Sequence, residues 1–179
     1  MTKYYEIGAF KNAVKENALR VKDELITTDI EGKAAYIVVH ISRKKIHLMR
    51  RYLLSGERPL ISDDFNAFEW LENDYKSTLP EVLQEIVKIG LLKEINVFGS
   101  NQGEAVESGR QWKYFKNTKH RIATYKKNDV CSRWWWLGTQ LSASRFAFAN
   151  RYGHAAGHTP SYSRVGLRPH LSIKRSDLI

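Results

Sequence analysis

Hydrophobic positions near the start of the chain recur at helical spacing. Within residues 8–25 they lie four and seven residues apart, with Lys and Glu between them; they are Phe10, Val14, Val21 and Leu25. This amphipathic spacing predicts a helix over residues 8–25. A turn is expected at residues 29–32, and the β-branched run AAYIVVHIS over residues 34–42 then predicts a buried strand.

Two further helices are predicted in the middle of the chain. Ser-Asp-Asp at residues 62–64 provides a helix cap before the segment FNAFEWLENDY. Pro80 fits the first turn of a second helix, LPEVLQEIVKIGLL, and Gly90 is expected near its C-terminal side. A short strand is predicted over residues 95–98, followed by a Gly-, Ser- and Asn-rich loop over residues 99–109.

The C-terminal part follows a different pattern. Residues 134–137 form a dense apolar run, Trp-Trp-Trp-Leu. Beyond it, Phe146 and Phe148 share one face of an extended segment while small and basic residues share the other, which predicts a strand with one buried face. Gly residues and Pro160 then interrupt the pattern, and a last short strand is expected over residues 165–173.

Composition also changes at residues 141–173. This stretch contains no Lys, Asp, Glu, Gln, Met or Trp, and it is filled by Ser, Ala, Gly, His, Tyr, Asn and Arg. Binding surfaces of the antibody type use Tyr, Ser, Asn, Gly and Arg because these side chains combine rigid rings with small, adaptable polar groups. The composition therefore indicates a binding surface in this part of the chain.

Length and charge limit the class of protein. The chain has 179 residues, 42% of them hydrophobic and 27% charged, which suits one compact soluble domain with a sizeable core, or one such domain with a small helical appendage. Its net charge of +10 is enough to attract polyanions such as nucleic acid, anionic glycans or a membrane surface, but an ordinary solvated basic surface is the favoured interpretation. Neither a signal peptide nor an apolar run long enough to span a membrane is evident. We expect synthesis in the cytoplasm, with a place in a virion or at a cell surface left open.

The densest basic cluster covers residues 43–51. It is either a patch that contacts phosphates or the solvent face of an amphipathic segment. The second interpretation is favoured because apolar residues are interleaved with the basic ones and are expected to point inward. These apolar residues are Ile46, Leu48, Met49, Leu53 and Leu54.

Three segments together resemble a domain of gut bacteria and their phages. They are FEWLENDYKSTLPEVLQEIV, INVFGSNQGEAVESGRQWKYFKN and WWWLGTQ…FAFANRYG…VGLRPHLSI, the last being similar to the pattern WWLRS…GVRP. The chain departs from that pattern at Gly138-Thr139 and at His170. The domain is similar to the formylglycine-generating-enzyme branch of the C-type lectin fold.

The resemblance implies an α+β, C-type lectin-like fold with two helices, short antiparallel strands and an irregular C-terminal loop surface. Residues 65–179 are expected to form the ligand-binding domain, with a display segment at residues 140–166. Residues 1–64 contribute the predicted N-terminal helix and strand, and they are expected to complete the fold or to aid assembly.

The same branch includes the variable proteins of diversity-generating retroelements, in which copying errors at adenines rewrite the end of a gene. Changing the two adenines of an AAC or AAT codon never yields Lys, Glu, Gln, Met or Trp. All five are missing from residues 141–173. The resemblance therefore implies a non-enzymatic display protein used for phage or bacterial receptor binding. A chance scarcity of long side chains in a loop-rich surface is the other explanation.

Known chemistries of the fold find little support in the sequence. Formylglycine-generating enzymes use paired cysteines, whereas Cys131 stands alone and is expected to pack beside the Trp run. A calcium-bridged sugar site needs clustered carboxylates, and residues 130–176 contain none. His154 and His158 lack an evident third metal ligand and lie in a predicted loop. We therefore expect no enzymatic activity, no metal and no cofactor.

Polar residues of the display segment are the candidate ligand contacts. They are Gln140, Ser142, Ser144, Arg145, Asn150, Arg151, Tyr152, His154, His158, Ser161, Tyr162 and Ser163. We expect Tyr152 and Tyr162 to anchor a protein or glycan ligand, and Arg145 and Arg151 to recognise its charge. Since basic residues outnumber acidic ones here, an acidic ligand is favoured.

Residues next to the display segment are assigned structural roles. Trp135 and Trp136 are predicted to lie in the core, while the environment of Trp134 is left open. Arg168, within the Arg-Pro pair of the family pattern, is expected to pair with an acid such as Glu104.

A nucleic-acid-associated protein is the alternative from a different class. It would use the basic cluster at residues 43–51 together with residues 111–125, where aromatic and basic side chains alternate. A hydrolase is a third class, for which no catalytic constellation can be named. The sequence is compatible with a homo-oligomer and does not identify the ligand.

Overall fold

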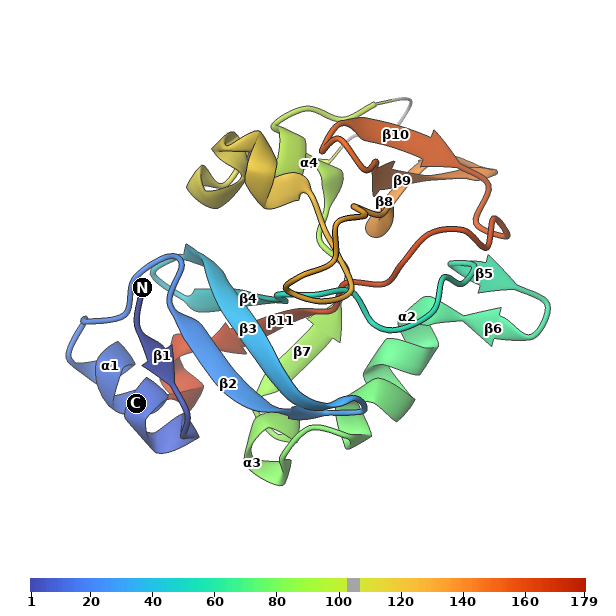
Figure 1. Ribbon diagram of the computed structural model, residues 1–179. Coiled ribbons are helices and arrows are strands. Elements are labelled where there is room, and N and C mark those ends of the chain that lie inside the picture. Colours follow the sequence, from blue (N-terminus) through green and yellow to red (C-terminus); the bar gives the residue numbers. More distant parts are fainter. Residues whose placement is uncertain (103–106) are drawn as a thin grey trace.

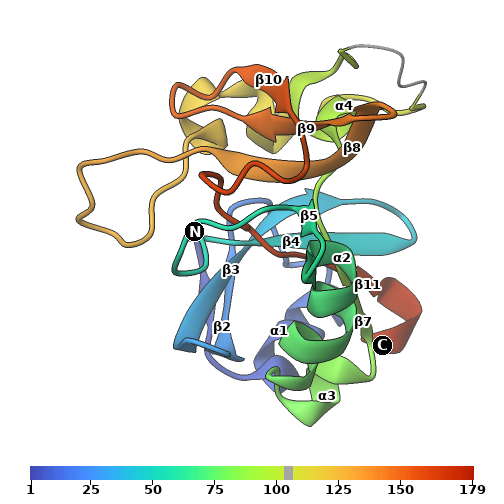
Figure 2. The same cartoon turned by 90° about the vertical axis from the view of Figure 1, so that its right-hand side faces the viewer.

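The computed structural model describes residues 1–102 and 107–179 and has a mixed α+β architecture (Figure 1). Figures 1 and 2 show two lobes. A six-stranded sheet with the first three α-helices forms the large lobe, and a three-stranded sheet with α4 and two short 3-10 helices forms the small lobe. We call residues 94–166 the small lobe and the remainder the large lobe.

Strands of the large sheet come from both ends of the chain, in the order β1-β2-β3-β4-β11-β7. Their bounds are β1 Lys3–Tyr4, β2 Glu24–Asp29, β3 Gly32–Ile41, β4 Lys45–Arg50, β7 Val87–Gly90 and β11 His170–Lys174. The small sheet has the order β10-β9-β8, and β5 and β6 form a separate hairpin. These strands are β5 Ile61–Ser62, β6 Phe65–Asn66, β8 Trp135–Ser142, β9 Arg145–Ala149 and β10 Ala155–His158.

Helices are short and lie against the sheets. They are α1 Ile7–Lys15, α2 Ala67–Trp70 continuing into η1 Leu71–Tyr75, α3 Glu81–Gln84, α4 Glu94–Phe98, η2 Lys113–Lys116, η3 Thr118–Arg121 and η4 Arg175–Asp177. None of the helices described is long and apolar enough to cross a membrane.

Strand β11 joins the two halves of the large sheet. Leu171 pairs with Leu48 of β4 on one side and with Ile89 of β7 on the other, both antiparallel. The sheet therefore spans the expected boundary at residues 64 and 65, and residues 1–64 supply four of its six strands.

Strand β3 confirms the buried strand predicted over residues 34–42, and both of its faces are covered. Tyr36 and Val38 pack with α1 in one core, while Ile37 and Val39 pack with the small lobe in another. Two buried faces explain why the sequence here is continuously apolar and does not alternate.

The predicted helix over residues 8–25 is wrong beyond its first half. Helix α1 ends at Lys15, and Asn17 has a left-handed backbone with φ 54° that does not continue a helix. Leu25 belongs to β2, where it pairs with Tyr36 of β3. Pairing in the sheet thus outweighed the helical spacing of Val21 and Leu25.

Two predictions in the middle of the chain are wrong in the type of element: part of a predicted helix is a strand, and a predicted strand is a helix. The helix after Pro80 ends at Gln84, because Val87 and Ile89 pair with β11 as strand β7. The strand expected over residues 95–98 is helix α4, which ends at Gly99 in the left-handed conformation with φ 83°.

The cap of α2 also differs from the prediction. Asn66 is the capping residue, and its Oδ1 accepts hydrogen bonds from the N–H groups of Phe68 and Glu69. Ser62 pairs instead with Phe65 in the β5–β6 hairpin.

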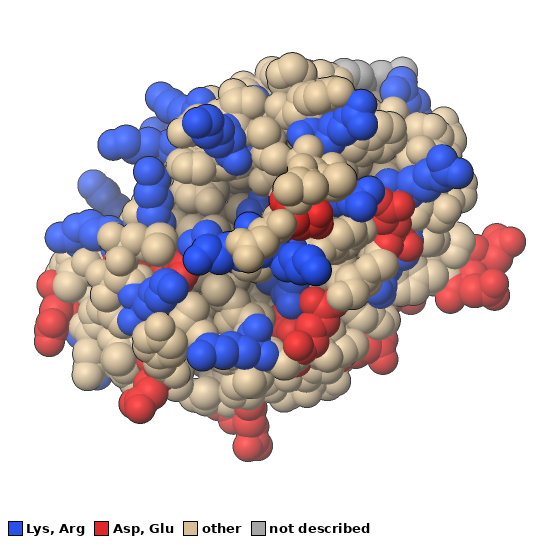
Figure 3. All heavy atoms as spheres, in the orientation of Figure 1, with Lys and Arg blue, Asp and Glu red and all other residues tan. Residues whose placement is uncertain are grey.

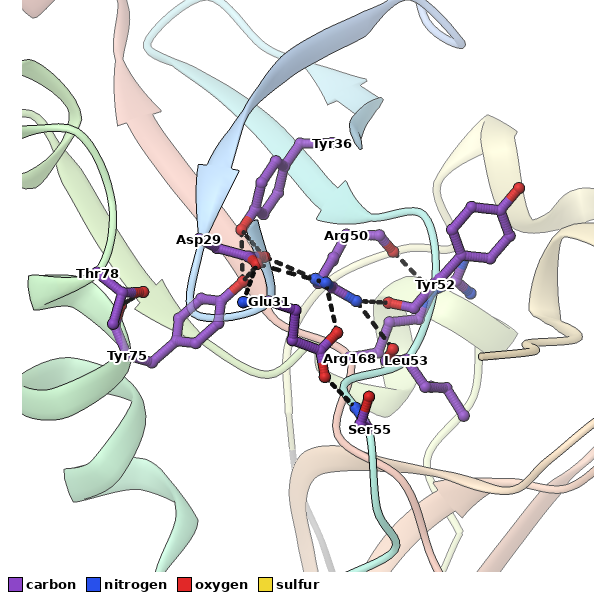
Figure 4. Close-up of polar contacts among 10 residues, drawn as sticks. All are labelled: Asp29, Glu31, Tyr36, Arg50, Tyr52, Leu53, Ser55, Tyr75, Thr78 and Arg168. Carbon is purple, nitrogen blue, oxygen red and sulfur yellow. Dashed lines mark hydrogen bonds and ion pairs between the residues drawn. The ribbon is translucent and has the colours of Figure 1, made fainter. Parts of the chain in front are cut away.

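A buried polar network ties β2, β3, β4 and η1 together (Figure 4). Asp29, at the end of β2, accepts hydrogen bonds from Arg50 Nε at 2.7 Å, Tyr75 Oη at 2.7 Å and Tyr36 Oη at 3.0 Å. Arg50 also donates to Glu31 Oε2 at 2.7 Å and to the carbonyl oxygens of residues 52 and 53. The Asp29 side chain is fully buried, so its charge depends on these donors.

The network sets the charge state of Asp29. Burial by itself would raise the pKa of this carboxyl, but hydrogen bonds from Arg50, Tyr75 and the Glu31 N–H outweigh burial and hold the pKa below its ordinary value. Arg50 is therefore part of the core and is not a solvent-facing charge.

The basic cluster at residues 43–51 mostly has the amphipathic character that was favoured. All five of its interleaved apolar residues are buried, which confirms that they point inward. Arg51 forms an ion pair with Glu24, and Arg50 is bonded to Asp29. Within this cluster the exposed basic side chains are Arg43 and Lys44, in the turn before β4, and Lys45, its first residue.

Aromatic rings join the small lobe to the large sheet. Trp112 stacks on His40 at a centroid distance of 4.8 Å and lies tilted against His47 at 4.7 Å, and His47 Nδ1 lies 3.0 Å from His170 Nε2. Burial, with a smaller contribution from neighbouring charges, lowers the pKa of His47 to about 4 and that of His170 to about 3. Both rings are therefore neutral at neutral pH.

We expect acid to destabilise the protein as the pH falls below about 6.5. The unfolded chain protonates His47 and His170 near that value, whereas the folded protein keeps both rings neutral until the pH approaches 4. Stability is thus complete above pH 6.5 and is lost below it, with a slope of up to about 2.7 kcal/mol per pH unit for two rings. Because its pKa is lowered, Asp29 adds a further loss below about pH 4.

Urea unfolding between about pH 7 and 4 measures this loss. The double variant His47→Phe, His170→Phe keeps the stacked rings but cannot be protonated at these positions, so its stability should fall much less steeply between about pH 6.5 and 4.5; His40, whose pKa is also lowered by burial, accounts for a remaining slope. His154→Phe, at an exposed position, is the control and should retain the slope. An unchanged slope in the double variant would contradict the assignment.

Candidate ligand-binding site

The Trp run at residues 134–137 anchors the small sheet. Trp135 and Trp136 begin β8 and point to opposite faces, each with 0% of its surface exposed, which confirms both as core residues. Trp135 Nε1 donates to the Arg121 carbonyl at 2.8 Å, and Trp136 Nε1 donates to the Arg58 carbonyl at 3.2 Å. Trp134, left open by the sequence, is half-buried and stacks on Phe148 at 5.1 Å.

Strand β9 has two buried faces, so the expectation of one exposed face is wrong. Phe146 and Phe148 pack toward the core shared with α2, while Ala147 and Ala149 pack against the core that contains Trp135. Only Arg145, its first residue, is exposed. Residues that reach solvent in this part of the chain therefore lie mainly at the strand ends and in the loops.

All twelve candidate contacts have some exposed surface. Nine are exposed and three are half-buried: Ser142, Asn150 and Tyr162. The strand pairing places the candidate contacts at two opposite ends of the small sheet. Ser142 pairs with Arg145 at one end, whereas Ala149 pairs with Trp135 and Ala155 at the other. Gln140, Ser144 and Arg145 thus lie far from the turn at residues 150–154.

Asn150 shapes that turn. Its Oδ1 accepts hydrogen bonds from the N–H groups of Tyr152 at 2.9 Å and His154 at 3.1 Å. The Arg151 guanidinium lies over the Tyr152 ring at 4.9 Å, and Tyr152 is 57% exposed. Asn150 therefore acts as a positioning residue, and Arg151 and Tyr152 are the side chains presented to solvent.

A hollow of about 450 Å³ opens beside this turn. Its lining residues are Glu57, Ser132, Arg133, Trp134, Arg151, Tyr162 and Arg164. Trp134 and Tyr162 lie 6.1 Å apart between ring centroids, and His158 stacks on Tyr162 at 4.1 Å. The hollow therefore combines an aromatic surface with guanidinium groups.

The hollow is electrostatically positive. Three arginines face a single carboxylate, Glu57, which lies 3.9 Å from Arg133 Nη1. Arg151 and Arg164 are exposed and have no ion-pair partner among the described residues. Guanidinium groups bind carboxylates, sulfates and phosphates through paired hydrogen bonds, so the hollow suits an anion attached to a planar or ring-shaped group.

The net positive charge of the chain comes from residues 108–169. Residues 108–169 contain twelve Lys or Arg and one acid, Asp129, whereas the rest of the chain contains 17 basic and 18 acidic residues. Figure 3 shows Lys and Arg over both lobes of this face, whereas Asp and Glu lie in the middle of the face and at its left, lower and right edges. Long-range attraction therefore favours an acidic ligand at the small lobe.

Sequence reasoning found Arg151 and Tyr162 of the hollow and left the other five lining residues out of the contact set. Arg133 and Trp134 lie next to the Trp run, and Arg164 follows the display tyrosine, so their proximity in sequence was a usable signal. Glu57 is 76 residues upstream of Arg133, and no local pattern points to it.

Residues 87–175 match the model of one protein family. That family is described as Domain of unknown function (DUF6273). The match begins at the first residue of β7 and ends at the first residue of η4, so it contains the small lobe and the strands that join it to the large sheet. No curated protein and no solved structure matches the chain at a significant level.

Arg168 has the structural position that was expected. It is buried, donates to the carbonyl oxygens of Arg50 and Arg51 at 2.9 Å each, and lies over the Trp135 ring at 5.2 Å. Glu104, the acid proposed as its partner, lies outside the described residues.

Cys131 and His158 lie in local environments that differ from those predicted from the sequence. Cys131 is exposed, so the expectation that it packs beside the Trp run is wrong; it precedes β8 in a loop that faces solvent. His154 directly precedes strand β10 and His158 is its last residue, and four residues of extended strand span about 13 Å. They are too far apart to act as a pair, and His158 is bonded to Thr159.

Proposed function

We propose that the small lobe is a non-enzymatic ligand-binding module that recognises an acidic protein or glycan. The observation that carries this proposal is the hollow of Arg133, Arg151 and Arg164 around Trp134 and Tyr162. Aromatic anchors beside arginines are typical of binding hot spots. The loops that carry them extend from a small sheet fixed by two buried tryptophans, so little ordering is needed on binding.

We propose further that the fold is of the C-type lectin-like type, in the formylglycine-generating-enzyme branch. Two features support this proposal. The Trp run opens the small sheet, and the C-terminal strand β11 returns to a sheet built largely from the N-terminal part of the chain. The irregular loops between these elements carry the candidate contacts.

The display segment, in this proposal, is the target of a diversity-generating retroelement, and the protein acts in receptor binding by a phage or a bacterium. The accessibility of the twelve candidate contacts supports this, because substitutions at exposed positions usually change stability by less than about 0.5 kcal/mol. Other positions in the display segment do not tolerate substitution in this way. A side chain at Gly157 would collide with Leu141, and Gly153 has φ 76°.

Sequencing this gene in many cells of one population tests the retroelement proposal. We expect substitutions at adenine-templated codons for the exposed candidates, with Gly153, Gly157 and the buried positions 146–149 unchanged. A template repeat that differs at adenines should lie beside a reverse transcriptase gene. Variation spread equally over buried and exposed codons would contradict the proposal, and a fixed segment would leave a binding module of single specificity.

Nucleic-acid binding is the second candidate, and one observation favours it. Residues 110–128 contain seven basic side chains and no acid, and Lys113, Lys116 and Lys119 are exposed. Trp112, Tyr114 and Phe115 in the same segment are buried, so they offer no surface for base stacking. This candidate requires affinity for nucleic acid that falls steeply with salt and does not depend on the hollow.

A further inference from the structure

We propose that the outer edge of strand β10 binds an extended acidic segment of a partner protein, which pairs with β10 as an added strand of the small sheet. The proposal rests on the function proposed above and narrows it, because it names a protein chain as the acidic ligand. It also gives a role to the backbone of β10, which lies between the two groups of candidate contacts.

The register of β10 turns part of its backbone outward. β10 is the first strand in the order of the small sheet and pairs with β9. The Asn150 N–H donates to the His154 carbonyl at 2.9 Å, so the ladder starts with a hydrogen-bonded pair. Hydrogen-bonded and non-hydrogen-bonded pairs alternate along an antiparallel ladder. The N–H and C=O groups of Ala155 and Gly157 therefore point away from β9.

Most of these outward groups are free. Within residues 1–102 and 107–179, the N–H and C=O of Ala155 and the N–H of Gly157 have no hydrogen-bond partner. The Gly157 carbonyl accepts from Arg145 Nη2 at 2.8 Å. Ala155 and Gly157 are only half-buried, and Figures 1 and 2 show β10 at the top of the small lobe. Free edge groups of this kind can pair with a strand from another chain.

The opposite edge of the small sheet is closed by the chain itself. Along β8, the Trp136 N–H donates to the Gly166 carbonyl at 3.0 Å, and the Gly138 N–H donates to the Leu92 carbonyl at 2.9 Å. Segments next to β11 and β7 thus occupy the backbone groups on that side. A strand can be added to this sheet at β10 and not at β8.

Charge indicates what kind of strand binds. Arg145 is exposed and gives one N–H to Gly157, which leaves its other donors for a carboxylate. Arg151, in the turn before β10, is exposed and has no ion-pair partner among the described residues. Residues 130–176 contain no acid. An acidic segment is therefore favoured, whereas a second copy of β10 would bring arginines against arginines.

An extended ligand also reaches both ends of the small sheet. The four residues of β10 span about 13 Å, from the turn at residues 150–154 to the end where Arg145 lies. Ala156 pairs with Phe148 and packs in the cluster that contains Trp134, which lines the arginine-rich hollow. Side chains of an added strand alternate between faces. One set would thus lie toward the hollow and the other toward the face that carries Arg145.

Backbone pairing distinguishes a protein ligand from the alternatives. It requires N–H and C=O groups at strand spacing, which glycans and nucleic acids do not have. It also works with any side chains in the display segment, because the bonds come from the main chain. The edge of β10 would then supply affinity, while the candidate contacts at its two ends supply specificity.

Binding of an acidic peptide to the full, isotope-labelled chain tests the proposal. The probe is the capped hexapeptide Val-Glu-Thr-Thr-Glu-Val, whose two Glu side chains fall on opposite faces of a strand. At saturation, hydrogen exchange at the Ala155 and Gly157 amides should slow by about tenfold or more, because both groups become hydrogen-bonded. The same peptide N-methylated at its four central residues keeps its charge but loses these donors. It should bind about tenfold more weakly or worse.

Variants of β10 provide a second measurement. Ala155→Pro removes an outward N–H and is compatible with an edge strand, so it should weaken peptide binding by about tenfold or more. Ala155→Val keeps the N–H and is the matched control, with an affinity within about twofold of the unmodified protein. Thermal unfolding shows whether Ala155→Pro is folded. The N-methylated peptide tests the same hydrogen bonds on the unmodified protein if it is not.

Three results would overturn strand addition. They are equal binding of the methylated and unmethylated peptides, bound peptide with unchanged exchange at Ala155 and Gly157, and no binding at about 1 mM peptide. The hollow is judged separately. Peptide that binds without pairing but is lost in Arg151→Glu, Arg164→Glu leaves the proposed function intact, as does binding of acidic glycans alone. If neither peptide nor glycan binds, both proposals fail.

Discussion

Asp29→Ala is expected to lower the free energy of unfolding by about 3 to 5 kcal/mol, the loss typical of breaking a buried ion pair. The variant leaves the Arg50 guanidinium buried with Glu31 and two carbonyl groups as partners. It also removes the acceptor that holds the hydroxyl groups of Tyr36 and Tyr75. Strands β2 and β4 and helix η1 would each lose a fixed contact, so the loss should be cooperative.

Urea unfolding at neutral pH, followed by tryptophan fluorescence, measures this loss. Asp63→Ala, at an exposed position in the turn of the β5–β6 hairpin, is the matched control and should change stability by less than about 0.5 kcal/mol. The double variant Asp29→Ala, Arg50→Met should be less unstable than Asp29→Ala alone, because it removes the unpaired charge. A loss below about 1 kcal/mol for Asp29→Ala would show that solvent reaches Arg50 and that the network is not a core element.

The double reversal Arg151→Glu, Arg164→Glu is expected to weaken binding of an acidic ligand by at least about 100-fold. Each arginine offers charge-assisted hydrogen bonds worth about 1.5 to 3 kcal/mol, and the new carboxylates repel the ligand. Both side chains are exposed, so the fold should tolerate the change. Immobilised sialylated, sulfated and uronic-acid glycans, with a neutral glycan beside them, are the probes.

The control is a second double reversal with the same change in net charge. Lys113→Glu, Lys116→Glu lies on η2, also exposed and also in the small lobe, but it does not line the hollow. Attraction by overall charge alone would fall equally in both variants. A specific site in the hollow should lose at least tenfold more affinity in the arginine variant. Equal losses would contradict the hollow as the site and would favour the polyanion surface along η2.

The fold was predictable where local pattern and tertiary contacts agree. Strand β3 has a continuous β-branched run and two buried faces, so sequence and structure coincide. Strand β7 was predicted as helix because Val87 and Ile89 have helical neighbours in the sequence, but their strand partners, Ile173 and Leu171, lie 86 and 82 residues away. Long-range pairing of this kind leaves no trace in local periodicity.

The sequence predicted the segment that carries part of the candidate site, but it did not identify all of the residues that line the hollow. The absence of long side chains drew attention to the display segment, where Arg151 and Tyr162 line the hollow. Arg133 and Glu57 come from loops outside that segment, so the hollow emerges only from the packing of several loops. Cys131 was misplaced because burial was inferred from the residue type alone, and a loop position overrides that preference.

The place of β11 between β4 and β7 has a consequence for how the chain is made. The strand lies downstream of residues 140–166, so a polypeptide interrupted or shifted in reading frame within that segment lacks it. Such a product would leave the ladder of β4 open at one edge, where unpaired backbone groups recruit other chains. In the retroelement system that we propose, only gene copies that keep the reading frame through this segment would give a chain able to close the large sheet, so folding itself would remove the others.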